Sequence, residues 1–443
     1  MKARLIACLA FAASGVFAAG APLKGIVLWP DQAEDHPELK DSISLEYSYC
    51  LPCDVATGTN AAGQVVYNWS SFEALLDGIA SRGHQAVIRF RYVYPGEKLG
   101  GVKGATAVPK FIKETPGYKE TYAQNPGGDG PTYYPDWSCK ALEDFTLDFY
   151  AKFAAKYDSD SRLAFVQAGF GHWAEYHTSG TETQPGVNFP TLDFQRRFFR
   201  LMAASFVQTP WMVSIDSAAR EEGYSPAVEM AGSGIAFGLF DDSFMCSEHE
   251  ISSGEGYNEL NWNAFGADHW KTAPHGGEIS YYDDSDQHNF LSSNGIYGVT
   301  WAQAAAKYHM TFVIANDAPE GRYATPARVS EAARECGFNL VAASVHRTQS
   351  GVGVRVRNTG VAPVYHDIGV RVGGVAASGT LKGLLPGAER VLVAEGASAD
   401  GALELVSQKL LSPVPLERVA SGGARPMLII TMKQSPSQYG SMP

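Results

Sequence analysis

Apolar residues fall into two alternating patterns over the first three quarters of the chain. Short apolar or alternating runs predict eight β-strands, at residues 25–29, 43–49, 86–92, 163–169, 211–216, 235–240, 278–281 and 310–315. Apolar residues at helical spacing predict helices at 71–82, 140–157, 192–208, 217–230, 258–271, 294–308 and 325–336. Strands alternating with helices in this way predict a (β/α)8 barrel, the TIM barrel, over residues 22–337. The alternative, an open doubly wound sheet, would want a glycine-rich phosphate turn after its first strand, and the sequence has none there.

The pattern changes after Gly337. Strand-like runs at 341–347, 352–358, 368–372 and 390–394 are separated by glycine-rich and proline-rich turns. We therefore expect a small antiparallel β-sandwich over residues 338–420, followed by a flexible tail at 421–443.

The first residues have the pattern of a secretory signal. Lys2 and Arg4 precede an apolar run at residues 5–16, and a small-residue cleavage site ends at Ala18. A signal peptide over residues 1–18 predicts a periplasmic or secreted bacterial protein. Later in the chain no run of about 20 apolar residues occurs, so we expect no membrane span. The formal net charge of -12 disfavours nucleic acid as a partner.

Cysteine spacing adds one structural expectation. Cys50 and Cys53 form a C-x-x-C pair, and in an oxidising compartment a short-loop disulfide between them is favoured. Free thiols are the first alternative, and redox or metal chemistry is the second.

One stretch between the third strand and the next helix, residues 93–138, has little periodicity. It contains several Pro-Gly and Gly-Gly pairs and the aromatic run at 133–137. Loops of this length in a compact domain are usually functional or disordered. Its aromatic residues favour an ordered lid over a site, with a disordered insertion as the alternative.

Polar side chains at the strand ends are candidates for chemistry, because the reactive groups of such barrels lie at the C-terminal ends of the strands. The fourth strand breaks at two glycines and then presents His172, Trp173, Glu175 and His177 within six residues. At the ends of the other strands the candidates are Arg89, Arg91, Asp216, Asp241, Asp242, Glu278 and Tyr281.

Glu175 and Glu278 form the pair that matters most, because strands four and seven lie across the barrel mouth. Hydrolysis of a glycosidic bond needs one carboxylic acid to protonate the leaving oxygen and a second carboxylate as nucleophile or base. We assign Glu175 as acid/base and Glu278 as nucleophile or base. Arg89 and Arg91 alternate with apolar residues, so both are expected to point into the barrel and to neutralise Glu46 or Glu278.

The remaining candidates are expected to bind substrate. Hydrogen bonds to sugar hydroxyls would come from His172, His177 and Asp216, and stacking on sugar faces from Trp137, Trp173 and the tyrosines at 133–134. The histidines lack helical i, i+4 spacing with a third ligand, so we expect no metal and no cofactor. Neither a P-loop nor a Gly-x-Ser-x-Gly elbow is present.

Several motifs together resemble a known family. These are Arg89-Phe-Arg-Tyr92, Gln167-Ala-Gly-Phe-Gly-His-Trp-Ala-Glu175-Tyr-His177, Phe240-Asp-Asp-Ser-Phe244, Gly276-Gly-Glu278 and Asn358-Thr-Gly-Val-Ala-Pro363. In this order they are similar to a family of secreted bacterial proteins of unknown function that is placed among the glycoside-hydrolase-type (β/α)8 barrels. The resemblance covers residues 25–415. It implies the barrel, a C-terminal β-sandwich and a saccharide substrate, without an established reaction.

The positions of Glu175 and Glu278 also resemble the large clan of retaining glycosidases with the acid on strand four and the nucleophile on strand seven. That clan usually has Asn immediately before the acid, where this chain has Ala174. In the secreted family the same position is usually Gly. The sequence therefore predicts a glycoside hydrolase acting on an oligo- or polysaccharide. Its alternative is a non-catalytic carbohydrate-binding protein that uses the barrel cleft.

Overall fold

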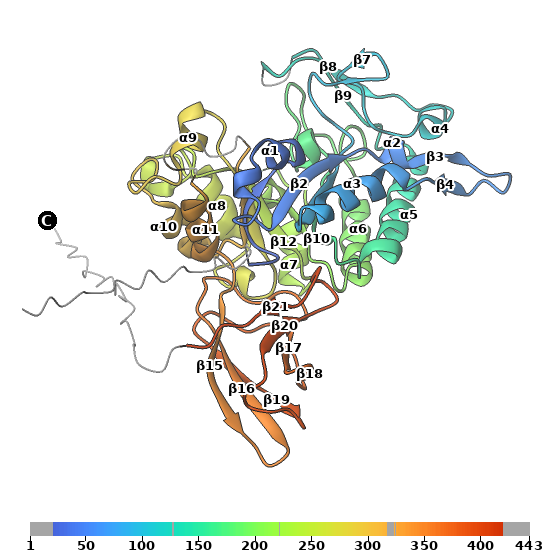
Figure 1. Cartoon of the computed structure of the whole chain (residues 1–443). Helices are drawn as coiled ribbons and strands as arrows, with labels where there is room; N and C mark the ends of the chain where they lie inside the picture. Colours follow the sequence, from blue (N-terminus) through green and yellow to red (C-terminus); the bar gives the residue numbers. More distant parts are fainter. Residues whose placement is uncertain (1–20, 126–127, 221, 317–322, 324, 420–443) are drawn as a thin grey trace, which may run out of the picture.

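A computed structural model describes residues 21–125, 128–220, 222–316, 323 and 325–419. The expected signal peptide and the expected tail at 421–443 lie outside these residues. Eight parallel strands close into a barrel (Figure 1). In chain order they are β1 (Gly25–Leu28), β2 (Leu45–Cys50), β5 (Gln85–Phe90), β10 (Leu163–Gln167), β11 (Trp211–Ser214), β12 (Gly238–Phe244), β13 (His275–Ile279) and β14 (Phe312–Ile314). The predicted TIM barrel is confirmed, and each of its strands overlaps one of the eight predicted strands.

Two strand boundaries differ from the prediction in a way that affects the site. β12 runs to Phe244 instead of ending at residue 240, so Asp241 and Asp242 lie inside the strand. Its register with β13 shifts between Asp241 and Phe244, which marks a bulge there. β13 begins at His275, three residues before the predicted start. The prediction missed these residues because two glycines interrupt the apolar pattern of the strand.

Helices cover the outside of the barrel (Figure 1). The longer ones are α3 (Ser70–Ser81), α5 (Lys140–Tyr157), α6 (Leu192–Ser205), α8 (Tyr257–Ala264), α10 (Trp301–Tyr308) and α11 (Pro326–Glu335). The shorter ones are α1 (Pro30–Asp35), α2 (Pro52–Val55), α4 (Lys110–Lys113), α7 (Ala227–Gly232) and α9 (Asp284–Asn289).

The predicted helix at 217–230 is wrong. A 3-10 turn, Ile215–Ala218, and the short helix α7 stand in its place. Gly223 has a positive φ of 65°, and Pro226 both lacks an N–H and restricts the residue before it, so a continuous helix cannot pass through. The predicted helix at 258–271 is likewise interrupted, at Gly266.

The long stretch at 93–138 carries secondary structure of its own. It contains the hairpins β6 (Lys98–Leu99) with β7 (Val102–Lys103) and β8 (Thr121–Ala123) with β9 (Thr132–Tyr134), besides α4. A further hairpin, β3 (Ala56–Thr59) with β4 (Val65–Tyr67), lies beside it in Figure 1. This stretch contributes Tyr94 to the cleft described below.

The C-terminal residues form two antiparallel sheets. One has the order β15 (Leu340–Arg347), β16 (Gly351–Asn358), β19 (Glu389–Glu395). The other has the order β18 (Val375–Ala376), β17 (Gly369–Val372), β20 (Leu403–Val406), β21 (Val414–Pro415). Inward-facing residues of both sheets, such as Val354 and Val370, are fully buried in one apolar cluster. These strands are the antiparallel sandwich that the sequence predicts.

The sandwich packs under one end of the barrel (Figure 1). Lys409 donates from its Nζ to the backbone oxygens of Asp158 (3.1 Å) and Asp160 (2.6 Å), just before β10 begins. Gln85, the first residue of β5, donates to the backbone oxygen of Lys409 at 2.6 Å. The contacts therefore lie at the N-terminal ends of the strands. The C-terminal ends, where such barrels place their chemistry, stay free of the sandwich.

The predicted disulfide between Cys50 and Cys53 is absent, and every cysteine in the described part of the chain is a free thiol. Cys50 is the last residue of β2 and packs against the barrel core. Cys53 lies in helix α2, with its Sγ 3.8 Å from Oδ1 of Asp54. Both cysteines are half-buried, and the chain changes from strand to helix between them. No helix in the described ranges has both the length and the apolar character needed to cross a membrane.

Candidate active site

A cleft of about 360 Å³ opens at the C-terminal ends of the barrel strands. Its walls are mostly aromatic, and its polar groups come from different strands. The lining residues are Trp29, Tyr49, Tyr94, Trp173, Glu175, Glu278, Tyr281, Gln287 and Asn316. Aromatic faces with a few fixed polar groups are typical of sites for small organic ligands.

Glu175 is placed by a tight turn after β10. A Cβ on Gly169 would lie 1.9 Å from the carbonyl oxygen of Ala174, so only glycine lets the chain fold back there. Trp173 and Ala174 have positive φ values of 45° and 60°, an unfavourable conformation for residues with a side chain. Backbone strain of this kind clusters at functional sites. The turn leaves Glu175 98% buried, at the edge of the cleft.

Ala174 stands at the position where the glycosidase clan noted in the sequence has Asn. Its side chain is fully buried beneath the turn and does not line the cleft. The side chain at this position, where that clan usually has Asn, therefore faces the protein interior here.

Arg89 joins the two glutamates. It is fully buried inside the barrel, with Nη1 3.2 Å from Oε1 of Glu175 and Nη2 2.6 Å from Oε1 of Glu278. Its Nε donates to Oε1 of Gln167 at 2.7 Å. The two contacts and the width of one guanidinium place the bound oxygens of Glu175 and Glu278 at most about 8 Å apart. This upper bound is compatible with paired glycosidase carboxyl groups, which lie about 5–9.5 Å apart. The pair that the sequence predicts across the barrel mouth is brought together.

The two arginines were predicted to neutralise Glu46 or Glu278, and this is correct only for Arg89 with Glu278. Arg89 neutralises Glu278, but Glu46 is paired elsewhere, with Arg82 at 2.5 Å and His84 at 2.6 Å. Arg91 follows the end of β5, and its guanidinium lies over the ring of Tyr94, 4.1 Å from the centroid. It makes no ion pair with a carboxylate of the described residues.

The two glutamates have different electrostatic surroundings. Burial and then the charge of Asp242 raise the pKa of Glu175 well above its ordinary value. Burial also raises the pKa of Glu278, but Arg89 opposes this, and Asn316 adds a long contact from Nδ2 at 3.4 Å. Glu175 is therefore the group that holds a proton more strongly, and Glu278 is the one better stabilised as a carboxylate.

A second group of polar side chains surrounds Glu175. His177 Nε2 lies 3.1 Å from Oε2 of Glu175 and 3.8 Å from Oδ2 of Asp216. Together with Asp242, these three residues form a cluster of four. One side-chain nitrogen or oxygen atom from each of the four lies within 4.8 Å of those of the others. Burial lowers the pKa of His177, yet the bond to Glu175 and the charge of Asp216 bring it up to about 9. Burial, and then Asp242, raise the pKa of Asp216 to about 7.

These four residues have the donor types and the spacing of a metal site. A histidine binds a metal as the neutral imidazole, so a metal here would have to displace a proton from His177, whose pKa the two carboxyl groups raise. Oε1 of Glu175 is also occupied by the guanidinium of Arg89. We therefore assign no metal to this cluster.

Of the residues predicted to bind substrate, Trp173 and Tyr281 line the cleft, and three of the others, His172, Trp137 and Asp241, are buried in contacts away from it. His172 is fully buried and hydrogen bonds to the hydroxyl of Tyr134. Trp137 is 1% exposed and packs in the core against Phe170, with ring centroids 5.2 Å apart. Neither can touch a sugar, so both predictions are wrong. Tyr134 is also fully buried, which removes it from the expected stacking pair.

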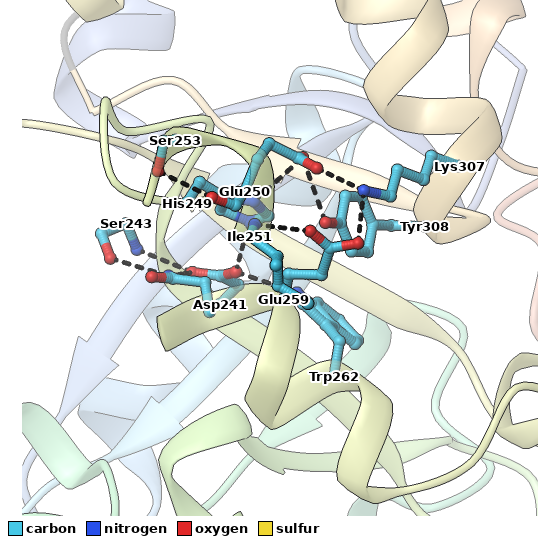
Figure 2. A network of polar contacts seen from close by, with 11 residues as sticks. Asp241, Ser243, His249, Glu250, Ile251, Ser253, Glu259, Trp262, Lys307 and Tyr308 are labelled. Atoms are coloured by element: carbon cyan, nitrogen blue, oxygen red, sulfur yellow. Dashed lines mark hydrogen bonds and ion pairs between the residues drawn. The ribbon is translucent and has the colours of Figure 1, made fainter. Parts of the chain in front are cut away.

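Asp241 is the third, and it faces away from the cleft into the network of Figure 2. Its carboxylate accepts hydrogen bonds from four donors: the backbone N–H of Ser243 (3.1 Å), His249 Nε2 (2.9 Å), Asn258 Nδ2 (2.7 Å) and Trp262 Nε1 (2.9 Å). The predicted contact with substrate is wrong for Asp241, because successive residues of a strand point to opposite faces.

The prediction missed several lining residues. Trp29 directly follows β1, Tyr49 lies at the end of β2, and Asn316 follows β14. The rule that found Glu175 also applies to them, since all three stand at C-terminal strand ends. Tyr94 and Gln287 come from longer connections, and nothing in their local sequence marks them.

No protein-family model matches the sequence, and no curated protein matches it either. Among solved structures, the fold is similar to the catalytic domain of β-amylase from Paenibacillus polymyxa (TM-score 0.44, 10% identity, 70% of this chain and 100% of that chain). It is also similar to endo-glycoceramidase II from Rhodococcus sp. (TM-score 0.43, 11% identity, 86% of this chain and 95% of that chain). For an endo-β-1,4-xylanase from Gloeophyllum trabeum the values are 0.39, 9%, 68% and 86%. These likenesses are too distant to carry a function, which has to come from the site.

Proposed function

We propose that the protein is a glycoside hydrolase acting on an oligo- or polysaccharide, with Glu175 as general acid/base and Glu278 as nucleophile or base. The observation that carries the proposal is the bridge of Arg89 between the two carboxyl groups inside an aromatic cleft. Two carboxyl groups flanking one bond, with pKa values pushed to different degrees, are what glycosidic hydrolysis requires.

The roles follow from the surroundings of each group. Glu175 keeps its proton and delivers it to the glycosidic oxygen as the C–O bond breaks. Glu278, held by Arg89, stays ionised and either attacks the anomeric carbon or activates a water molecule. The half-buried ring of Trp173 and the exposed ring of Tyr281 line the cleft and offer faces on which a sugar ring can stack.

A saccharide-binding protein without catalysis is the second candidate, because aromatic walls alone would hold a sugar. The two candidates differ in what the carboxyl groups do. In a binding protein, either glutamate can become a glutamine with no loss beyond affinity. In a hydrolase, turnover stops while affinity is largely kept.

The test is a screen of oligosaccharides and aryl glycosides with the wild type, Glu175→Gln and Glu278→Gln. Glu248→Gln is the matched control, because Glu248 is exposed and does not line the cleft. We expect Glu278→Gln to be inactive on every substrate. Glu175→Gln should retain turnover only on aryl glycosides, whose leaving groups need little protonation. Full turnover in both variants contradicts the proposal. Binding in all variants without turnover in any supports the binding protein.

A further inference from the structure

Asp242 lies in the cluster around Glu175 and has no role in the reaction as described so far. It follows Asp241 in β12 and takes the opposite face of the strand, toward the cleft side. A carboxyl oxygen of Asp242 lies within 4.8 Å of side-chain atoms of Glu175, His177 and Asp216.

The cluster and its neighbours carry more acids than bases. Glu175, Glu278, Asp216 and Asp242 supply four carboxyl groups, against the guanidinium of Arg89 and the imidazolium of His177. Because crowded charges that are largely buried have to be compensated, it is costly to hold all four carboxyl groups ionised without another positive charge. A retained proton supplies it.

The geometry shows where that proton is held. Glu278 has Arg89 at 2.6 Å, Asp216 has His177 at 3.8 Å, and Glu175 shares both cations, with Arg89 at 3.2 Å and His177 at 3.1 Å. No arginine or lysine among the described residues forms an ion pair with Asp242. Two carboxyl groups this close share a proton, because both cannot be ionised at little cost. Asp242 is therefore the acid that needs the proton, and its hydrogen bond with Glu175 makes that pair the place for it.

We propose that Asp242 is a positioning residue that shares a proton with Glu175 and so keeps Glu175 in its acid form. Its effect on kinetics rests on the proposed function, whereas the shared proton itself does not. The charged and titratable groups that face Glu175 from the surrounding elements are Tyr49, Arg89, His177, Asp216, Asp242, Glu278 and Tyr281. Among them Asp242 makes the largest charge contribution to the raised pKa of Glu175.

The shared proton affects both halves of the reaction, the protonation of the leaving oxygen and the deprotonation of the incoming water. When Glu175 gives its proton to the leaving oxygen, both carboxyl groups of the pair become ionised and repel one another. Glu175 is then a stronger base and takes a proton from the incoming water more readily. Asp242 contacts no reacting atom in this scheme.

The kinetic test compares the pH dependence of kcat/KM in the wild type and Asp242→Asn. We expect the alkaline limb of the profile to move to lower pH by about one unit or more, the size of shift that a charge within about 4–6 Å produces. Asp216→Asn is the matched control, since it removes a carboxyl group of the same cluster whose cationic partner is His177, at 3.8 Å. In that variant the limb should stay in place or move to higher pH. A limb unchanged in Asp242→Asn, or shifted equally in both variants, overturns the proposal.

A second measurement needs no substrate and so separates this proposal from the proposed function. The infrared carbonyl stretch of a protonated carboxyl group should be present at neutral pH in the wild type and weaker in Asp242→Asn. Thermal unfolding shows whether the variant is folded. Equal bands in both proteins overturn the proposal even if the enzyme is active. A divalent cation that binds the wild type but not Asp242→Asn overturns it as well, because a cation would then hold the place of the proton.

Discussion

Asp241 and Asp242 are neighbours in the same strand, yet they face two different environments. Asp241 accepts hydrogen bonds from four donors and belongs to the network in Figure 2. Asp242 lies among two other acids and one histidine, and burial together with the charge of Asp241 raises its pKa. One carboxylate is fully satisfied, and the other is not.

This difference separates a group that stabilises the fold from a group that serves the site. A buried carboxylate with all its acceptor positions filled cannot change its protonation or its contacts without cost. A carboxyl group among like charges is energetically unfavourable, and favourable interactions elsewhere in the structure offset this cost. The network side of β12 should therefore respond to mutation in stability, and the cleft side in activity.

The largest expected effect is on the cleft side. Glu278→Gln should lower turnover by at least about 10³-fold, because the reaction loses its nucleophile or base. Its free energy of unfolding should fall by less than about 2 kcal/mol, because the glutamine oxygen still accepts a hydrogen bond from the buried Arg89. Steady-state kinetics and urea unfolding of the same preparation measure both. A variant that lost stability and activity together would erase the distinction between the two sides.

On the network side, Asp241→Ala should lower the free energy of unfolding by about 3–5 kcal/mol. The change leaves the buried cation of His249 and the N–H groups of Asn258 and Trp262 without their acceptor. Asp242→Ala should change the same quantity by less than about 1 kcal/mol, or raise it. Denaturant unfolding curves at neutral pH provide the comparison. Equal losses in the two alanine variants would show that the two carboxylates do not differ.

The sequence predicted the barrel, and with it Glu175 and Glu278, because strand ends in this fold converge at one mouth. It could not separate Asp241 from Asp242. The predicted strand stopped at Phe240, which placed both acids in a loop with no defined side. In the structure β12 continues to Phe244 through a bulge, so the alternation of the strand decides which acid faces the cleft.

Other errors have the same origin. Trp137 lies in a long connection whose path no local pattern reports, and only the packing against Phe170 shows that it belongs to the core. His172 comes one residue before Trp173, but the left-handed turn sends one side chain inward and the other to the cleft. Spacing along the chain identified the segment that carries the site. The side of each residue depends on backbone geometry that forms only when the barrel closes.

The pH dependence of stability should carry the signature of the network. Burial lowers the pKa of His249, but Asp241 and Glu250 raise it from 6.5 to about 9. The folded protein thus binds this proton more tightly than the unfolded chain does. The resulting stabilisation, about 3 kcal/mol, is complete below about pH 6.5 and is lost as the pH rises through 9. Unfolding free energies from pH 6 to 10 should fall with pH in the wild type.

His249→Gln provides the control for that experiment, because other groups such as His177 also titrate in the range. The variant should be less stable than the wild type at pH 6, and the gap should close toward pH 10. A gap of constant size would mean that His249 is not held as a cation by Asp241.

The smallest expected effects compare two tyrosines, one on each side. Tyr281 is 44% exposed in the cleft, whereas Tyr308 is buried and donates from its hydroxyl to Glu250 at 3.0 Å. Tyr281→Ala should weaken saccharide binding by about 1 kcal/mol, roughly fivefold, through loss of a stacking face, and leave unfolding unchanged. Tyr308→Phe should lower the free energy of unfolding by about 1 kcal/mol through loss of one hydrogen bond, and leave binding unchanged. Calorimetric titration with an oligosaccharide bound by the wild type and urea unfolding measure the two quantities. If Tyr281→Ala destabilised the fold instead, or Tyr308→Phe weakened binding, the cleft and the network would have to be treated as one coupled unit.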